Sequence, residues 1–280
     1  MNNISILSWQ NYHGRKPGSI GSSVIRADWL IAADDRFKAW KHGVGYDALI
    51  LQKVYWKDLM QDFKGPKILD VCDPDWLDGK CNIAELSTMV NAITTSSEEL
   101  KAEIDPYAQC PVIHVPDRIN FDMLPSPKKI SSARPQTLVW YGYINNARRT
   151  LDQVLESIAG MGLDLLVVAN DKYEPMNDYG VNIENVLWEP GKAWQEIQRG
   201  DIVLNPRLFE AKYRFKSNNK TVIAQALGLP VATTIDELEL LMDEQGRIDA
   251  MKKANIILPG YDIKKSAEQY IEILNEYGRS

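Results

Sequence analysis

Short apolar segments alternate along the chain with polar and helix-forming stretches, and this alternation predicts the elements of the fold. In the first half the apolar runs are four to six residues long and show no polar face. Strands that are buried on both faces are typical of parallel sheets with helices on each side. The predicted strands of this half are Ile4–Trp9, Tyr46–Gln52, Lys67–Cys72, Ala92–Thr95 and Pro111–Val115.

Helices are predicted between these strands, where apolar residues recur at helical spacing. The clearest begins at Ser96 or Ser97, either of which can cap it, and carries Glu98 and Glu99 in its first turn. The predicted helices of the first half are Val24–Ala33, Ala84–Val90 and Ser96–Ile104.

A change of composition separates the two halves. Residues 125–136 (PSPKKISSARPQ) combine three prolines with serines and basic residues, which is typical of a linker. Beyond it the alternation restarts. The predicted strands are Thr137–Tyr141, Leu163–Val168, Val186–Leu187, Ile202–Asn205 and Pro230–Thr233, and the predicted helices are Thr150–Gly160, Ala193–Arg199, Asn219–Leu227, Ile235–Met242 and Tyr261–Ser280.

Two successive arrays of strands and helices predict an α/β protein with two Rossmann-like βαβ domains that face each other across a cleft. The expected domains are 1–124 and 137–258. The amphipathic segment 259–280 is expected to form a helix that packs at their interface. A chain of 280 residues is long enough for two such cores.

Composition and charge narrow the function classes. No apolar run approaches the roughly 20 residues of a membrane helix, and the uncharged N-terminal stretch predicts a buried strand rather than a signal peptide. Three cysteines, an odd number without metal-ligand spacing, argue against a disulfide framework and favour a cytoplasmic location. The net charge of −6 argues against broad attachment to nucleic acid, although a local basic groove remains compatible with it.

The strongest chemical pattern is a basic, hydroxyl- and amide-rich turn that opens the predicted helix after residue 218. A helix N-terminus offers unpaired N–H groups and a positive dipole end, so it can hold a diphosphate, and lysines there add charge. The alternative is that a serine or asparagine merely caps a surface helix and the lysines are solvated. The candidate residues are Lys216, Ser217, Asn219, Lys220 and Thr221.

This stretch resembles the C-terminal domain of GT-B glycosyltransferases of family 4 (group 1). In that family a strand ending in D-[IV]-x-[LV]-x-P precedes the pattern S-x-N-K-x-x-E-A-x-A-x-G-x-P-V. The matching positions here are Asp201 to Pro206, Ser217, Asn219, Lys220, Ala224, Ala226, Gly228, Pro230 and Val231.

One position departs from the family pattern. The acidic residue that usually grips the donor ribose falls on Ile223, which cannot accept a hydrogen bond. Either Asn219 or Thr221 holds the ribose instead, or donor recognition differs, or activity has been lost. Glu210 matches the family's earlier acidic position only loosely.

The start of the second domain carries further candidates. Residues 138–142 (LVWYG) resemble the family's strand and glycine, whose following basic residue faces the donor diphosphate. Arg148 and Arg149 lie near that place, and arginine suits phosphate because its planar fork makes two hydrogen bonds at once. Trp188 lies where the family often contacts the donor base.

The first domain resembles the family more weakly. Its glycine-containing loop, with Gly21 as a candidate, lies where backbone approaches the donor phosphate and acceptor, but it forms no dinucleotide fingerprint. Asp73 and Asp75 follow a strand at its carboxyl edge, where they can orient an acceptor hydroxyl or act as a base. The alternative is that these aspartates only cap a helix.

The resemblance implies a glycosyltransferase, hexosyl- or pentosyl-, that moves a sugar from a nucleoside diphosphate sugar to an acceptor hydroxyl with retention. No metal and no further cofactor are expected, and Lys220, Lys216 and Arg148 would stabilise the leaving diphosphate. The acceptor side is 1–124 and the donor side 137–258; the acceptor is a glycan, a small molecule or DNA. Alternatives are a non-catalytic nucleotide-sugar-binding protein, a phage-type DNA-modifying glycosyltransferase and a sugar-nucleotide epimerase.

A DNA acceptor would call for a basic groove. The residues that could line it are Lys128, Lys129, Arg134, Arg148, Arg149, Lys212 and Arg214.

Overall fold

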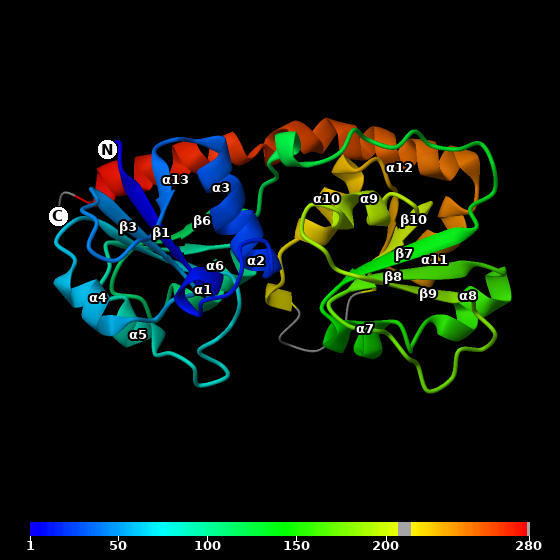
Figure 1. The fold of residues 1–280 in the computed structure, drawn as a ribbon, viewed down its shortest axis with the longest axis horizontal. Coiled ribbons are helices and arrows are strands. Elements are labelled where there is room, and N and C mark those ends of the chain that lie inside the picture. Colours follow the sequence, from blue (N-terminus) through cyan, green and yellow to red (C-terminus); the bar gives the residue numbers. More distant parts are fainter. Residues whose placement is uncertain (207–213, 279–280) are drawn as a thin grey trace. The chain divides into compact units, whose positions relative to one another are not determined.

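The computed structural model describes residues 1–206 and 214–278. By its internal contacts the chain divides into two compact units, each an α/β structure around its own sheet (Figure 1). Over the described residues, the first unit comprises 1–121, 214–218 and 260–278, and the second comprises 122–206 and 219–259. In this division the segment 125–136 belongs to the second unit.

The first unit is built on a parallel six-stranded sheet in the order β2-β1-β3-β4-β5-β6. Residues of β1, β3 and β5 are buried along their whole length, as their unbroken apolar runs predict. The strands are β1 (Ile4–Ser8), β2 (Phe37–Ala39), β3 (Ala48–Gln52), β4 (Lys67–Val71), β5 (Ala92–Thr95) and β6 (Val112–His114).

Helices of the first unit follow its strands. Ser97 caps α6, because its Oγ accepts from the Leu100 N–H at 3.2 Å, which decides between the two predicted capping serines. The helices are α1 (Trp9–Tyr12), α2 (Gly21–Ser23), the π-helix η1 (Val24–Asp28), α3 (Trp29–Ala33), α4 (Lys57–Asp62), α5 (Ile83–Leu86), α6 (Glu98–Ile104) and α13 (Ile263–Tyr277). The 3-10 turns η2 (Phe121–Met123) and η4 (Leu258–Tyr261) each contain residues of both units.

The strand order places a topological switch point between β1 and β3. From β1 the chain goes to one side for β2 and then to the other side for β3 and its successors. In open parallel sheets, ligands bind beyond the carboxyl ends of the strands at such a point. The segments that follow β1 and β3 are therefore the favoured ligand-binding region of the first unit.

Helix α13 is joined to this sheet by a buried ion-pair network centred on Arg26 of η1. The Arg26 guanidinium contacts the Asp70 carboxylate at 2.5 Å and that of Asp117 at 2.7 Å, and it also donates to the Tyr270 hydroxyl of α13 at 3.0 Å. Arg26 and Asp70 are 5% and 0% exposed. Burial alone would lower the pKa of Arg26, but the Asp70 carboxylate outweighs it and holds that pKa above the ordinary value.

The second unit has a parallel five-stranded sheet in the order β11-β10-β7-β8-β9. Its switch point lies between β7 and β10, because the chain runs outward through β8 and β9 and then returns to the other side of β7. The strands are β7 (Thr137–Gly142), β8 (Asp164–Ala169), β9 (Ile183–Leu187), β10 (Ile202–Leu204) and β11 (Val231–Ala232).

The helices of the second unit cover an apolar core around Trp140, Leu165, Val167 and Leu238, all at most 1% exposed. They are α7 (Ile144–Thr150), α8 (Leu155–Met161), α9 (Ala193–Ile197), α10 (Asn219–Ala226), α11 (Ile235–Leu241) and α12 (Glu244–Ile257). No described helix of either unit is long and apolar enough to cross a membrane.

The predicted fold class, an α/β protein with two Rossmann-like domains, is confirmed. The single helix predicted over Thr150–Gly160 is wrong, since two shorter helices, α7 and α8, flank a turn there. Strand β2 and helices α4 and α12 were not predicted. Strand β2 is a three-residue segment (FKA) with a lysine at its centre, and its pairing with β1 makes it a strand.

Gly228 allows the segment 125–136 to approach the turn between α10 and β11. Its φ is +84°, and a Cβ at this position would lie 2.2 Å from the Lys128 carbonyl oxygen. We expect Gly228→Ala to lower the free energy of unfolding of the second unit by at least 1–3 kcal/mol, because backbone strain and a backbone clash add. Urea unfolding measures the loss. Gly160→Ala, a helical glycine with open space around its Cβ, is the control and should cost nothing.

Candidate functional site

The most specific arrangement of the second unit lies at its switch point, beyond the carboxyl end of β7. Lys220, in the first turn of α10, extends its ammonium group over Gly142, the last residue of β7. A Cβ on Gly142 would lie 2.5 Å from Lys220 Nζ, and the φ of Gly142 is +144°. Glycine therefore leaves the space that the ammonium group occupies.

Two aromatic rings and a hydrogen bond hold Lys220 in this place. Its Nζ lies 4.5 Å from the centroid of the Trp140 ring and 5.7 Å from that of Tyr141. The Tyr141 hydroxyl donates to the Lys220 carbonyl at 2.6 Å. Burial raises the pKa of Tyr141, so this hydroxyl stays protonated and remains a donor. The lysine is thus fixed through both its backbone and its side chain.

The helix that carries Lys220 begins beside the end of β10. Thr221 Oγ1 accepts from Asn205 Nδ2 at 3.4 Å, and Asn205 follows β10 directly. The first turn of α10 therefore presents its N–H groups, one ammonium group and a hydroxyl near the carboxyl ends of β7 and β10. Such an arrangement suits a phosphate or diphosphate group.

Ile223 takes no part in this polar surface. Its side chain is 3% exposed, and its neighbours Val222 and Ala224 are buried as well. A carboxylate at this position of this structure would lose its solvation. Where the family has an acidic residue, this chain therefore has an apolar side chain that packs in the core.

The other candidates of the second unit lie at the same edge of the sheet. Arg148 and Arg149 are exposed on α7, which begins directly after β7, and the Ile144 N–H donates to Asn170 Oδ1 at 2.8 Å beyond β8. Trp188 follows β9 and is half-buried, with its ring edge-on to Trp194 at 5.1 Å. Two strand spacings separate β9 from β7, or about 10 Å.

Lys216 and Ser217 belong to the first unit instead. Lys216 Nζ forms a close ion pair with Asp73, and the Ser217 hydroxyl donates to Asp117 at 2.5 Å. The residues proposed as one phosphate-binding turn are thus divided: Lys216 and Ser217 contact aspartates of the first unit, and Asn219, Lys220 and Thr221 open α10 in the second.

Asp73 and Asp75 follow β4, and both lie in ion pairs. Lys53 Nζ lies 2.5 Å from one carboxylate oxygen of Asp73, and Lys216 contacts the other oxygen. Asp75, 4% exposed, accepts from the Tyr55 hydroxyl at 2.9 Å and from Lys80 Nζ at 2.8 Å. These lysine and tyrosine partners fix both carboxylates in place, so both can act as positioning groups.

Sequence reasoning missed Lys53 and Tyr55, the partners that come from the end of β3. Lys53 has a φ of +54°, a conformation that is uncommon outside glycine and is concentrated at functional sites. Nothing in the local sequence marks this conformation. Gly21 opens α2 in the same unit, is exposed, and has open space around it.

The pKa of Asp73 leads to a pH-dependent stability. Burial alone would raise it, but the ammonium groups of Lys216 and Lys53 outweigh burial and hold the pKa below its ordinary value of 3.8. A carboxyl group whose pKa is lower in the folded state than in the unfolded state stabilises the fold at pH values above its unfolded-state pKa. This contribution to stability is lost as the pH falls through the folded-state pKa.

We therefore expect Asp73→Asn to be less stable than the wild type at pH 6–7, with the difference shrinking as the pH falls from about 4 toward 2. Urea unfolding across this range measures it. Asp171→Asn, at an exposed carboxylate of the second unit, is the control. A difference that is constant with pH would contradict the assignment of the ion pairs.

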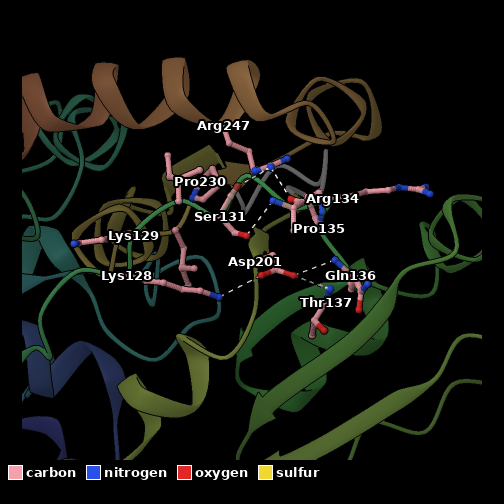
Figure 2. Close-up of a pocket in the computed structure, with 14 residues that line it drawn as sticks. Lys128, Lys129, Ser131, Arg134, Pro135, Gln136, Thr137, Asp201, Pro230 and Arg247 are labelled. Atoms are coloured by element: carbon pink, nitrogen blue, oxygen red, sulfur yellow. Dashed lines mark hydrogen bonds and ion pairs between the residues drawn. The ribbon is translucent and has the colours of Figure 1, made fainter.

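A separate cavity of about 310 Å³ lies at the opposite edge of the second sheet, where β7, β10 and β11 begin (Figure 2). In it, Lys128 Nζ contacts Asp201 at 3.3 Å, and the N–H groups of Gln136 and Thr137 donate to the same carboxylate. Arg247 donates to four backbone carbonyls at 2.9–3.0 Å. These contacts of Lys128 and Arg247 hold the segment 125–136 against the unit.

The cavity also tests the predicted basic groove. Three of its residues, Lys128, Lys129 and Arg134, line the cavity where β7 begins, whereas Arg148 and Arg149 lie beyond the end of β7. The two ends of β7 are about 16 Å apart. Arg214 pairs with Glu103 in the first unit at 2.8 Å. The basic residues of the second unit therefore form two groups at opposite ends of β7; Lys212, like Glu210, lies outside the described residues.

Comparison with solved structures places the chain in a known fold. An alpha-glucosyltransferase solved in complex with UDP and a DNA 13-mer containing an HMU base superposes with a TM-score of 0.67 over 98% of this chain and 99% of that chain, at 11% identity. The lipopolysaccharide outer core galactosyltransferase WaaB superposes with a TM-score of 0.59 over 98% and 99%, at 10% identity. The predicted GT-B fold is confirmed by these likenesses.

The crystal structure of TarM superposes with a TM-score of 0.56, at 10% identity, over 82% of this chain. This chain spans 55% of the length of TarM, about half. No known sequence family matches the chain. No curated protein matches it by sequence either.

Proposed function

We propose that the chain is a glycosyltransferase that moves a sugar from a nucleoside diphosphate sugar to an acceptor hydroxyl. The observation that carries the proposal is the position of Lys220, whose ammonium group lies over Gly142 at the switch point of the second sheet. A fixed cation beside a helix N-terminus, in the region where parallel sheets bind ligands, suits a diphosphate leaving group. The GT-B fold supports the same reaction by likeness.

In this proposal the second unit binds the donor. Lys220 and the N–H groups of α10 contact the diphosphate, Arg148 or Arg149 adds a second positive charge, and Trp188 lies against the base. Thr221 or Asn219 holds the ribose in place of the carboxylate that Ile223 replaces. We propose a retaining, metal-independent transfer, as the family resemblance implies.

In the reaction the bond between the anomeric carbon and the β-phosphate oxygen breaks, and the nucleoside diphosphate leaves with the electron pair. The acceptor oxygen forms the new bond to the anomeric carbon, and its proton passes to the departing phosphate. Positive charge at Lys220 stabilises the diphosphate as its negative charge develops. Asp73 and Asp75, which are held in ion pairs, act as positioning groups of the first unit in this account.

A non-catalytic nucleotide-sugar-binding protein is the second candidate, and the buried Ile223 favours it. The compared alpha-glucosyltransferase was solved with DNA, which makes DNA modification a specific form of the first proposal. A sugar-nucleotide epimerase receives no comparable support.

Calorimetric titration with UDP, GDP, ADP and their glucose, galactose and mannose derivatives tests the proposal. We expect one nucleoside diphosphate to bind, with its sugar slowly hydrolysed when no acceptor is present. Binding without hydrolysis or transfer to any offered acceptor supports the binding protein. No binding by any of these nucleotides would overturn both candidates.

A further inference from the structure

An aromatic shelf lies at the switch point of the first sheet, a place that the proposed donor site does not use. It consists of Trp9 and Tyr12 of α1, His13 directly after them, and Trp56 after β3. The Tyr12 ring lies 5.0 Å from that of His13 and 5.8 Å from that of Trp56, and His13 lies 4.3 Å from Trp9. The shelf thus joins the segments after β1 and β3, between which the strand order reverses.

The shelf is accessible. Tyr12 is 47% exposed, and His13 is exposed as well, whereas Trp9 and Trp56 are half-buried and support them. An exposed aromatic ring backed by further rings offers a flat apolar face with little freedom to move. Such a face suits a planar or ring-shaped ligand group.

The loop after the shelf is basic. No acidic residue precedes Asp28 in the chain, although the whole protein has a net charge of −6. Arg15 and Lys16 are both exposed. Around Trp56, Asp58 is exposed on α4, and Glu85 of α5 pairs with Lys57 at 2.6 Å. Two exposed cations therefore follow Tyr12 in the chain, and the exposed Asp58 lies near Trp56.

Backbone hydrogen bonds hold this loop in one conformation. The Arg15 N–H donates to the Gln10 carbonyl at 2.8 Å, and the Ser19 N–H donates to the Lys16 carbonyl at 3.2 Å. Asp28 accepts from the Gly18 N–H at 3.0 Å and from Gln10 Nε2 at 2.7 Å. The carboxylate of Asp28 is thus used within the loop, and the two cations are presented on a fixed backbone.

We infer that the aromatic shelf, with Arg15 and Lys16, binds a single strand of nucleic acid, an unstacked base lying against Tyr12 and the two cations contacting its phosphates. Stacking rings beside fixed cations are the general means by which proteins hold single strands. The two cations that follow Tyr12 favour a ligand that carries phosphates over an uncharged glycan. That this nucleic acid is the acceptor rests on the proposed glycosyl transfer, whereas its binding at the shelf does not.

Fluorescence anisotropy with a short labelled oligodeoxynucleotide, and with the RNA of the same sequence, tests the inference on the full chain. Tyr12→Ala should weaken binding about 5- to 150-fold, as expected for one base stacked on an aromatic ring. Lys16→Ala should reduce the slope of log affinity against log salt by about 0.7, the value for one phosphate contact with a single strand. The DNA and RNA arms show which strand is bound more tightly.

Matched controls come from the opposite edge of the same sheet. Tyr107, 57% exposed after α6, and Lys64, exposed before β4, lie where the strands begin. Tyr107→Ala and Lys64→Ala should leave the affinity and the salt slope unchanged. Equal losses in Tyr12→Ala and Tyr107→Ala would overturn the inference, as would strand binding that neither variant changes.

Two further measurements separate this inference from the proposed function. Tyr12→Ala should keep the wild-type affinity for the nucleoside diphosphate. If the chain binds single-stranded nucleic acid at the shelf but no nucleoside diphosphate, the proposed transferase function is overturned and the shelf inference stands. If the chain binds nucleotide but no single-stranded nucleic acid, the shelf inference is overturned and the proposed transferase function stands. The same holds if Tyr12 is needed to bind maltooligosaccharides and no nucleic acid binds.

Discussion

Replacing Lys220 by alanine is expected to raise the dissociation constant of the nucleoside diphosphate about 10- to 150-fold. The loss corresponds to a charge-assisted hydrogen bond worth about 1.5–3 kcal/mol. Donor hydrolysis or transfer should fall further, by about 10²- to 10³-fold, because the ammonium group meets more negative charge in the transition state than in the bound donor. Titration calorimetry and product release at saturating donor measure the two effects.

Two variants make the Lys220 result specific. Gly142→Ala places a Cβ 2.5 Å from Lys220 Nζ and should displace the ammonium group without removing it, so nucleotide affinity should fall in this variant too. Lys192→Ala, at an exposed lysine of the same unit that pairs with Glu189, should bind nucleotide as the wild type does. Wild-type affinity in Lys220→Ala, with the melting temperature unchanged, would remove the basis of the proposed donor site.

Replacing Arg26 by methionine is expected to have the largest effect on stability. The change leaves the carboxylates of Asp70 and Asp117, 0% and 8% exposed, without their guanidinium partner. Breaking a buried pair by removing one partner costs about 3–5 kcal/mol. For a unit of this size that corresponds to a fall in melting temperature of roughly 6–20 °C.

Differential scanning calorimetry measures this fall. Arg36→Met is the matched control, because Arg36 pairs with Asp34 at 2.6 Å but its side chain is 41% exposed, and an exposed pair contributes at most about 1 kcal/mol. The double variant Arg26→Met/Asp70→Asn should recover part of the loss, since it removes one of the two uncompensated charges. Equal melting temperatures for Arg26→Met and Arg36→Met would contradict the importance of the network.

Local sequence determined most of the elements of the fold. Unbroken apolar runs such as Ala92–Thr95 became buried parallel strands, and the prediction of a capped helix at Ser97 was confirmed because a capping bond joins residues three positions apart. Such patterns depend on neighbours in the chain, which a sequence displays directly. The prediction failed at β2, whose strand exists through pairing with β1, and at residues 150–160, where a turn separates α7 from α8.

Tertiary structure alone decided which candidate residues come together. Lys220 meets Gly142, a residue 78 positions earlier, whereas Lys216, only four positions before Lys220, pairs with Asp73 in the other unit. The same holds for Arg26, whose partners Asp70, Asp117 and Tyr270 come from three distant segments. The sequence by itself determined the two arrays of strands and helices and the residue types able to hold a diphosphate. Ion pairs and ring contacts depend on distances in space, so their partners were set only when the two sheets formed.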